Sequence, residues 1–452
     1  MRKILIISYY YKHKNAMASI RAIKLAKYFS RQGHQVTVLT SSQRDTWTRD
    51  YLIPQADEKI REYYAPEVRR WTWITRFLEY RRRVGQQKSA VRKIAAPSKE
   101  GDSGAGAPAR GVISFRQRMV SYLKWLFYFY CSRQEDVCMY LGLKKELRRL
   151  NLPEFDTVIA TYPNYGALLT GMWLKRRRKC RQLIADFRDP LYNPGFRDHR
   201  LELKYDLKCF RQILRYADRI VCVSRGIADG IYEVEPGYAK AVDVITNGFD
   251  PDDVSAADLP VSFEAGRLHF VYTGTLYHGK RCVNMLAEVL AELIREGTIT
   301  KERFSFEYAG PDFSELLLQL RAFDLESTAR DHGFVSRAES IAMQKAGDAL
   351  LLLTWNESAY QGVVPGKLFE YMAIGNVPII ALITGDVRDS EVAVILRTAQ
   401  AGCACEEAAK EADMPRLKDF VIDLFHGKVK MSSRVNQYCY ESISEQYSKI
   451  ME

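Results

Sequence analysis

The stretch that most constrains the fold of this chain runs from residue 349 to residue 380. Ala349 to Thr354 is a continuous apolar run of strand length, typical of a parallel strand that is buried on both faces. Pro365 stands where a helix can begin. Four apolar residues then recur at helical spacing: Leu368, Phe369, Met372 and Ala373. Gly375 ends the helix and Pro378 opens the next apolar run, so the stretch predicts a strand–loop–helix–strand unit of an α/β fold.

The start of this helix predicts a phosphate site. In a parallel sheet such a loop lies at the carboxyl edge, and the helix N-terminus points into the ligand crevice. Free N–H groups at Gly366, Lys367 and Leu368 favour phosphate, and Lys367 adds a full charge. Glu370, one turn further on, is suited to accept hydrogen bonds from sugar hydroxyls. The alternative is that Lys367 and Glu370 form a solvated i,i+3 pair.

The N-terminus shows the same alternation. Lys3 to Ser8 is an apolar strand, Ser19 can cap the helix that follows, and Val36 to Thr40 is a second strand. This unit predicts a Rossmann-like half, but it lacks G-x-G-x-x-G, which argues against dinucleotide binding. Its first loop offers three polar candidates: Asn15, Ser19 and Arg21. The alternative for Arg21 is a solvated helix position.

The strand–loop–helix pattern restarts in the second half of the chain. His269 to Tyr272 is a strand, and it leads into a glycine-bearing loop with Gly274 and Thr275. Glycine lets the backbone approach a ligand closely, and the adjacent Lys280 and Arg281 can neutralise a diphosphate. We therefore expect both cations to project into a cleft. The alternative is that they are exposed cations at a helix start.

Charged residues also follow a strand in the first half. The run Gln182 to Asp186 predicts a strand, and Arg188 and Asp189 come directly after it. Paired acids around an arginine at the carboxyl end of a strand are expected in a ligand crevice. The alternative is a structural Asp–Arg–Asp loop that neutralises itself.

An insertion of basic and aromatic residues covers about residues 65–133. Residues 69–93 hold nine Lys or Arg and one acid, and residues 97–111 are rich in Gly, Ala, Ser and Pro, which predicts a disordered linker. Phe115 to Arg133 is aromatic, flanked by cations and too short to span a bilayer. We expect contact with anionic membrane, or a helix that packs its aromatic residues on the first domain. No nucleic-acid module is present, so no nucleic-acid partner is expected.

Composition limits the class of protein. The chain has 452 residues, a net charge of +12 and no run of 18 apolar residues, which predicts anionic partners and no membrane-spanning helix. The first apolar run lacks a cleavage site and is interpreted as a strand rather than a signal peptide. Nine scattered cysteines predict reduced thiols, and the pattern of the seven histidines predicts no metal site. The expected location is the cytoplasm, with the inner face of the cell membrane as an alternative.

The segment P-G-K-L-F-E-Y-M-A-I-G-N-V-P-I-I, which contains Glu370, resembles the donor-binding helix of retaining family 4 glycosyltransferases of the GT-B fold. In that family this glutamate holds the ribose of the nucleotide sugar. The usual pattern has a second glutamate where this chain has Gly362. The sequence A-D-F-R-D-P, which ends at Pro190, is similar to an element of bacterial enzymes that build cell-surface polysaccharide.

The resemblance implies an α/β fold with two Rossmann-like domains that face each other across a cleft. Its expected parts are an acceptor-side domain at 1–250, a linker at 251–266, a nucleotide-sugar domain at 267–430 and a C-terminal helix at 431–452 that returns to the first domain. By the same resemblance, Phe334 and Val335 contact the nucleotide base. The loop with Asn15, Ser19 and Arg21 faces the donor phosphates and the acceptor.

The implied reaction transfers a sugar, with retention, from a nucleotide-diphosphate sugar to a glycan or a polyprenyl-diphosphate-linked acceptor. No cofactor or metal is implied, because fixed cations stabilise the departing diphosphate. The expected catalytic group comprises Lys280, Arg281, Asp186, Arg188 and Asp189. Two alternatives are a nucleotide-sugar epimerase, whose serine-double-glycine loop is absent, and a donor-binding scaffold, suggested by Gly362.

Overall fold

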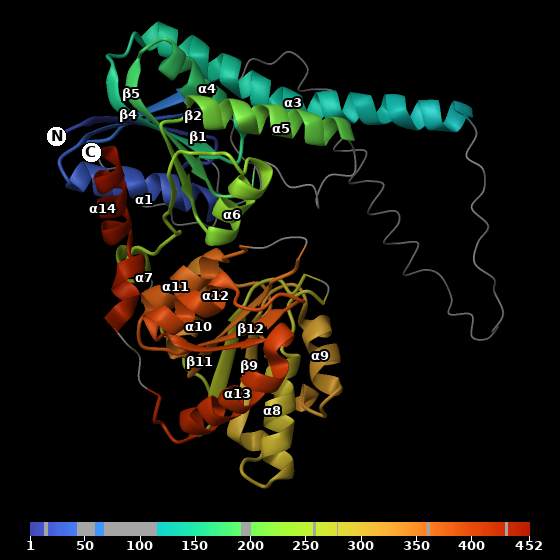
Figure 1. Ribbon diagram of the computed structural model, residues 1–452. Helices are drawn as coiled ribbons and strands as arrows, with labels where there is room; N and C mark the ends of the chain where they lie inside the picture. Colours follow the sequence, from blue (N-terminus) through green and yellow to red (C-terminus); the bar gives the residue numbers. More distant parts are fainter. Residues whose placement is uncertain are drawn as a thin grey trace.

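The computed structural model describes residues 1–12, 17–42, 59–66, 115–190, 200–255, 259–277, 279–358, 362–429 and 433–452. Two parallel sheets, each covered by helices, lie one above the other (Figure 1). This confirms the predicted α/β architecture with two Rossmann-like domains. None of the described helices is long and apolar enough to cross a membrane.

The first sheet has the strand order β3-β2-β1-β4-β5-β6-β7, and all its described pairs are parallel. Its strands are β1 (Lys3–Ser8), β2 (Gln35–Ser41), β3 (Arg61–Ala65), β4 (Phe155–Tyr162), β5 (Cys180–Phe187), β6 (Arg219–Cys222) and β7 (Val242–Val244). Its helices are α1 (Met17–Arg31), α3 (Phe115–Leu150), α4 (Tyr165–Arg176), α5 (Arg200–Tyr216) and α6 (Arg225–Val234). The apolar run predicted for β1 is buried from Ile4 onward, as expected for a central strand.

The second sheet has the order β10-β9-β8-β11-β12-β13 and is also parallel. Its strands are β8 (Leu268–Thr273), β9 (Phe304–Ala309), β10 (Ala329–Asp331), β11 (Ala349–Trp355), β12 (Ile379–Thr384) and β13 (Gly402–Glu406). The helices are α8 (Asn284–Arg295), α9 (Phe313–Arg321), α10 (Arg337–Ala346), α11 (Gly366–Ile374), α12 (Glu391–Ala399) and α13 (Lys410–Phe425). Strands β8 and β11 are neighbours although they are distant in sequence, so the strand order switches between them and a crevice opens at their carboxyl ends.

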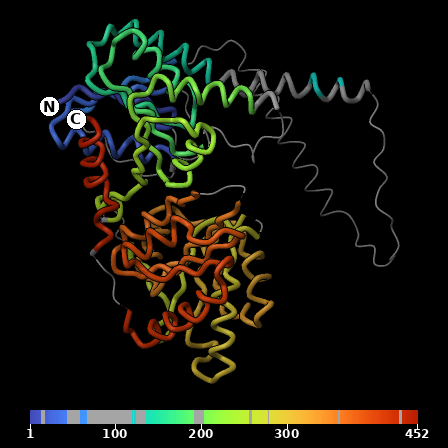
Figure 2. Tube along the Cα trace, viewed as in Figure 1, coloured from blue at the N-terminus to red at the C-terminus, as the bar shows by residue number. Residues whose placement is uncertain are grey.

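Two segments join the halves (Figure 2). The chain passes from β7 through the short helix α7 (Asp252–Ser255), and it returns through α14 (Tyr440–Met451). Phe249 and Cys439 form an isolated parallel bridge between these two segments. Figure 1 shows α14 beside α1, with both ends of the chain on the same side of the first half. The predicted return of the C-terminal helix is therefore confirmed.

Helix α14 completes the core of the first half. Tyr440, Ile443, Tyr447 and Met451 pack in one cluster with residues of β1 and α1, including Phe29. The rings of Phe29 and Tyr447 lie edge to face with their centroids 6.0 Å apart. Gly248, in the segment before α7, leaves no room for a side chain, because an added Cβ would come within 2.3 Å of Ile443 Cδ1 and of the Tyr438 carbonyl oxygen. The first half is thus built from both ends of the chain.

Candidate active site

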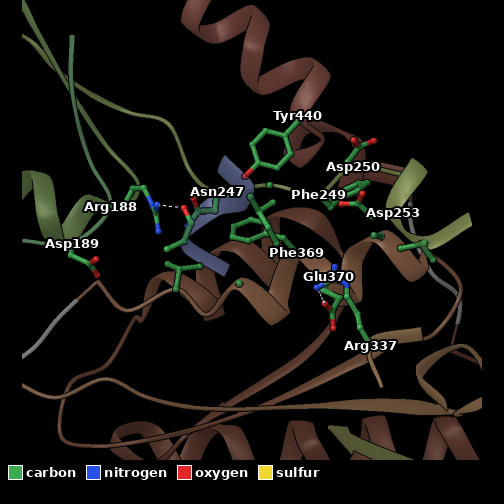
Figure 3. Close-up of a pocket in the computed structure, with 17 residues that line it drawn as sticks. Arg188, Asp189, Asn247, Phe249, Asp250, Asp253, Arg337, Phe369, Glu370 and Tyr440 are labelled. Atoms are coloured by element: carbon green, nitrogen blue, oxygen red, sulfur yellow. Dashed lines mark hydrogen bonds and ion pairs between the residues drawn. The ribbon is translucent and has the colours of Figure 1, made fainter. Parts of the chain in front are cut away.

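A cavity of about 210 Å³ lies between the two halves (Figure 3). The first half contributes Ala18, Ile20, Arg188 and Asp189 to its lining. The second half contributes Arg337, Val364, Gly366, Phe369, Glu370 and Ala373. The connecting segments supply the rest: Asn247, Gly248, Phe249, Asp250, Asp253, Val254 and Tyr440. Three predicted site residues other than glycine, namely Arg188, Asp189 and Glu370, therefore share one cavity.

Helix α11 positions Glu370. Pro365, with φ −62°, precedes the first turn, and Gly375 ends the helix with φ 80°, a conformation that favours glycine. Glu370 lies one turn in and is 11% exposed. Its carboxylate accepts a hydrogen bond from Gln344 Nε2 at 3.0 Å and lies 3.4 Å from Arg337 Nη1. The alternative of a solvated pair with Lys367 is therefore wrong for Glu370, which is held by α10 on the wall of the cavity.

Lys367 reaches back to the end of β8. Its ammonium donates to Thr273 Oγ1 at 3.1 Å and lies 3.9 Å from the Glu370 carboxylate. Gly274, with φ 149°, lies so close that an added Cβ would be 3.1 Å from Lys367 Cε. Burial lowers the pKa of Lys367; Glu370 opposes that effect, and the nearby cations Arg281 and Arg337 lower the pKa further. Lys367 and Arg337 thus lie beside Glu370, and Arg281 lies near Lys367.

Arg281 is held against aromatic rings at this crevice. Its guanidinium lies 4.5 Å from the ring centroid of Tyr277 and 5.6 Å from that of Trp355. Its Nη1 donates to the carbonyl oxygen of Thr275 at 3.0 Å. Its Nε is buried and has no hydrogen-bond partner among the described residues. Arg281 does not line the cavity of Figure 3, and its guanidinium is held by Tyr277, Trp355 and the Thr275 carbonyl oxygen.

Lys280, the neighbour of Arg281 in the sequence, is paired with a carboxylate. Its ammonium pairs with both carboxylate oxygens of Glu357, at 3.0 and 2.9 Å, and its side chain is half exposed. It also lies 5.4 Å from the ring centroid of Trp355. The pair with Glu357 neutralises the ammonium, and the projection of Lys280 into the cleft stays a prediction. The sequence places these two residues 77 positions apart, so the pairing left no local signal.

Arg21 and Asp186 pair with each other inside the first half. Arg21 is 1% exposed and Asp186 is fully buried, with Arg21 Nη2 3.0 Å from Asp186 Oδ1. Tyr447 of α14 donates to the same carboxylate at 2.8 Å. Burial disfavours the charged form, but Asp186 outweighs it and raises the pKa of Arg21. The solvated alternative for Arg21 is therefore wrong. A residue that contacts substrate would have to line the cavity, and neither Arg21 nor Asp186 does so.

Arg188 and Asp189 lie at the cavity instead. Arg188 Nη1 donates to the carbonyl oxygen of Ala18 in the first turn of α1, and burial lowers the pKa of Arg188. The buried Arg188 Nε has no hydrogen-bond partner among the described residues. Burial also raises the pKa of Asp189, an effect that Arg188 opposes. The alternative of an Asp186–Arg188–Asp189 loop that neutralises itself is therefore correct only for Arg188 and Asp189. Asp186 instead accepts hydrogen bonds from Arg21.

Other predicted residues fall in different places. Ser19 does not cap α1, which already begins at Met17, and Ser19 is buried in its first turn. The side chain of Leu368 is fully buried in the core, so only its backbone is near the helix start. Phe334 is 90% exposed and Val335 packs partly against the core below it. Asn15 lies outside the described residues.

Gly362 approaches the first half. It has φ 77°, and an added Cβ would lie 2.7 Å from Ser224 Oγ and 3.1 Å from Gly226 Cα, at the start of α6. In this arrangement the glutamate found there in the resembling family has no space. Glu391 of α12 reaches the same helix start and accepts a hydrogen bond from the backbone N–H of Gly226 at 2.6 Å. A carboxylate of the second half thus caps a helix of the first, a contact that the sequence did not indicate.

The connecting segment is tied to α1 by a second network that the sequence reasoning missed. Asp250, only 1% exposed, accepts from Lys24 at 2.7 Å, from Lys27 at 2.5 Å and from Tyr28 at 3.0 Å. Burial alone raises the pKa of Asp250, but the two lysines lower it to about 2. Lys24 also bonds Asp253, which lines the cavity. These pairs are more than 220 residues apart in sequence, so only the folded chain brings them together.

Comparisons with known proteins agree with this geometry. The model of the glycosyl transferase 4-like domain matches residues 18–248. A sucrose-phosphate synthase from Thermosynechococcus elongatus superposes with a TM-score of 0.55 at 12% identity, covering 100% of this chain and 98% of the other. A lipopolysaccharide outer core galactosyltransferase gives 0.54 at 13% identity, covering 99% of each chain. A structure from E. coli described as trehalose-6-phosphate, bound with UDP-2-fluoro glucose, gives 0.57 at 11% identity, covering 99% and 98%. No curated protein matches the sequence.

Proposed function

The chain belongs to the glycosyl transferase 4-like family, and from this premise we propose that it transfers a sugar from a nucleotide-diphosphate sugar to a glycan or lipid-linked acceptor, with retention of anomeric configuration. The family match and the fold of the solved relatives support a glycosyltransferase of the GT-B type. They do not favour the epimerase or the scaffold. We further propose that the anomeric configuration is retained, that the acceptor is a glycan or is linked to a lipid, and that the product enters polysaccharide synthesis.

One observation carries the proposal: an excess of positive charge at the crevice between β8 and β11. Arg281 and Arg337 both lie near Lys367, Glu370 lies beside Lys367 and Arg337, and Asp253 also lies near Arg337, so three cations meet two carboxylates. The N-terminus of α11 adds backbone N–H groups that favour phosphate. A bound diphosphate would restore the balance of charge. Glu370, held by Arg337 and Gln344, would accept hydrogen bonds from the ribose hydroxyls.

The proposed chemistry needs no group that accepts the sugar covalently. The bond between the anomeric carbon and the diphosphate oxygen breaks, a bond from that carbon to an acceptor hydroxyl oxygen forms on the same face, and the proton of that hydroxyl passes to the departing diphosphate. Negative charge grows on the departing diphosphate, so fixed cations bind the transition state more tightly than the donor. We assign the largest share to Arg281, because it follows β8 beside Lys367 and has no carboxylate partner among the described residues, whereas Lys280 is paired with Glu357. Because fixed cations would stabilise the departing diphosphate, we predict that the reaction needs no metal ion.

The acceptor would enter from the first half. Arg188 and Asp189 reach the cavity from the end of β5, opposite Glu370 on α11 (Figure 3). Asp189 lines the cavity, so its carboxylate would accept a hydrogen bond from the acceptor hydroxyl. Acceptors of the lipid-linked kind would bring the enzyme to a membrane surface, where anionic lipid would meet a chain of net charge +12.

The test is a transfer assay with the purified full-length chain. UDP-, GDP-, ADP- and dTDP-sugars are supplied separately, with and without a membrane lipid extract, and nucleotide release is measured. We expect one donor to be consumed faster with extract, and proton NMR of the product to show the anomeric configuration of the donor. Arg281→Ala should abolish the release, whereas Arg295→Ala, an exposed arginine at the end of α8, should not. No release from any donor, or an inverted product, would overturn the proposal in whole or in part.

A further inference from the structure

Helix α3 carries exposed apolar side chains along one of its sides. They are Met119 at 46%, Tyr122 at 44%, Leu123 at 56%, Val137 at 42% and Leu141 at 40% exposure. Met119 and Val137 are 18 residues apart, as are Leu123 and Leu141, and 18 residues make about five full turns of an α-helix. The five residues therefore lie on one side of α3, within an arc of about 100°, and we call them the α3 stripe.

The opposite side of α3 faces the body of the protein. Met139, Leu143 and Leu147 are buried in the core of the first half. Two acids of this helix, Asp136 and Glu146, are also buried, each at 8% exposure. The exposed stripe is thus a second apolar face, separate from the one that holds the helix in the fold, and these two carboxylates do not lie on it.

Cations continue the α3 stripe toward the C-terminal end of the helix. Lys144 and Arg148 follow Leu141 at spacings that keep them on the same side. Both lie over the ring of Trp173 in α4, at 5.8 and 5.9 Å from its centroid, and Arg177 lies over the same ring at 5.2 Å. Three positive charges therefore surround one indole where the apolar stripe ends.

Cations extend this surface onto α5. Arg176 of α4 and Arg215 of α5 both lie over the ring of Tyr216, at 5.6 and 5.9 Å from its centroid. Arg176, Arg177 and Arg215 are exposed. The cations at Trp173 and Tyr216 together form a basic end for the α3 stripe.

We propose that the α3 stripe and its basic end dock the protein on the surface of an anionic lipid bilayer, with α3 lying in the interface. Aliphatic side chains suit the boundary between headgroups and acyl chains, and the lysine and arginines suit anionic headgroups. No described helix can span a bilayer, so contact would be peripheral. The inference deepens the proposed function, because it assigns the surface at which a lipid-linked acceptor would be met.

Three other occupants fit the observations less well. Residues 69–93 of this chain hold nine cations and one acid, so they would repel the basic end. A second copy paired face to face would bring together two positively charged surfaces. Single-stranded nucleic acid binds mainly through stacking on aromatic rings, whereas four of the five exposed residues of the stripe are aliphatic.

Docking on this stripe would orient the enzyme. Helix α3 runs along the first half, beside α4 and α5, and away from the second half (Figure 1). The half that carries Arg188 and Asp189 would then face the membrane, and the donor-side crevice between β8 and β11 would stay in water, where nucleotide sugars dissolve.

The experiment is vesicle flotation of the full-length protein. One vesicle is pure phosphatidylcholine, and the other contains three parts phosphatidylglycerol to seven parts phosphatidylcholine. We expect binding to the anionic vesicle alone. Leu141→Glu should weaken it roughly tenfold or more, since a leucine that would be buried in the bilayer is replaced by a group with the same negative charge as the lipid headgroups. Lys144→Glu with Arg148→Glu should weaken it at least as strongly, at roughly fivefold for each cation lost.

Matched controls lie on the second half. Leu318→Glu replaces a leucine that is 65% exposed on α9, and Arg295→Glu with Arg303→Glu reverses two exposed charges. Neither control should change vesicle binding, and circular dichroism should show that all variants fold. Wild-type protein that fails to float, or variants of α3 that float like wild type, would overturn the proposal.

Other results would show that the α3 stripe or its basic end binds a different partner. A dimer in sedimentation equilibrium that Leu141→Glu disperses, without vesicle binding, would make it a contact between copies. Binding of a single-stranded oligonucleotide that survives Leu141→Glu but not the charge reversal would assign the cations to nucleic acid and overturn the proposal. Because flotation requires no donor, its failure would leave nucleotide release unchanged and so would be distinguishable from failure of the proposed function.

Discussion

The two halves of the molecule both place cations and carboxylates beyond the carboxyl ends of their strands, but with opposite balance. In the first half, Asp186 accepts from Arg21 Nε at 3.1 Å, from Arg21 Nη2 at 3.0 Å and from Tyr447 at 2.8 Å, and it is fully buried. In the second half, Lys367 and Arg337 lie beside Glu370, Arg281 lies near Lys367, and Arg281 retains a buried Nε without a partner in the described part of the chain.

The comparison shows that position at a sheet edge does not by itself make a charged residue a ligand contact. Arg21 also bonds the backbone oxygens of Ile245 and Thr246, at 2.9 and 2.6 Å, so its donors are occupied by the fold. A saturated ion pair stabilises structure, whereas an unsaturated excess of charge favours a counter-ion from outside. The following predictions test that contrast, beginning with the largest expected effect.

Replacing Arg21 should damage stability rather than chemistry. Arg21→Ala leaves the buried Asp186 carboxylate without its cation, and breaking a buried pair in this way costs roughly 3–5 kcal/mol. Urea unfolding, followed by circular dichroism, measures the change. Arg31→Ala, which removes a pair that is more than half exposed, should cost about 1 kcal/mol or less. Equal losses for the two variants would contradict the structural role of Arg21.

Replacing Arg281 should do the reverse. Arg281→Ala removes a cation at the proposed diphosphate, and we expect kcat to fall by roughly a hundredfold or more while the fold persists. Lys280→Ala is the matched control, because the pairing of Lys280 with Glu357 neutralises its charge. Steady-state kinetics with the preferred donor decides the point. A kcat for Arg281→Ala within about threefold of wild type would remove the diphosphate assignment.

Glu370→Ala should weaken donor binding. Losing a charged hydrogen-bond partner costs on the order of 1.5–3 kcal/mol, which corresponds to roughly a tenfold to 150-fold rise in the Kd of the nucleotide sugar. Isothermal titration calorimetry measures it directly. Glu288→Ala, a glutamate on α8 that is 43% exposed, should bind the donor like wild type. An unchanged Kd for Glu370→Ala would remove the ribose role.

Acid should loosen the segment that joins the halves. The pKa of Asp250 falls from 3.8 to about 2 on folding, so its contribution is fully present above 3.8 and is lost as the pH drops toward 2. A shift of this size corresponds to about 2 kcal/mol. The free energy of unfolding, measured between pH 5 and pH 2, should decline less steeply in Asp250→Asn. Parallel declines in both proteins would show that other groups set the acid limit.

The regular elements of the sequence were the easiest to predict. The strands β1 and β11 and the helix start at Pro365 follow from apolar runs and turn residues. Elements without such runs were missed. Strand β3 (REYYA) is polar and lies at a sheet edge, and no elements were predicted for residues 385–430, where α12, β13 and α13 lie. The local hydrophobic pattern therefore predicted the central strands, but it did not predict the edge strands β3 and β13 or the helices α12 and α13.

The site divides in the same way. Lys367 and Glu370 could be found because they share one helix turn beside a glycine-rich loop. Arg337 and Gln344 could not, because nothing in α10 indicates which of its side chains meets Glu370. Arg21 and Asp186 are 165 residues apart, so their mutual saturation, which decides their role, becomes visible only in the fold.

The return of α14 to the first half has a consequence for biosynthesis. Tyr447 supplies a hydrogen bond to Asp186, and Met451 fills the core beside α1, yet both are translated after the whole second half. Domains commonly fold in the order in which they leave the ribosome. Here the first half stays incomplete, with apolar surface uncovered, until α14 has followed the second half, so we expect the emerging first half to bind chaperones in the meantime.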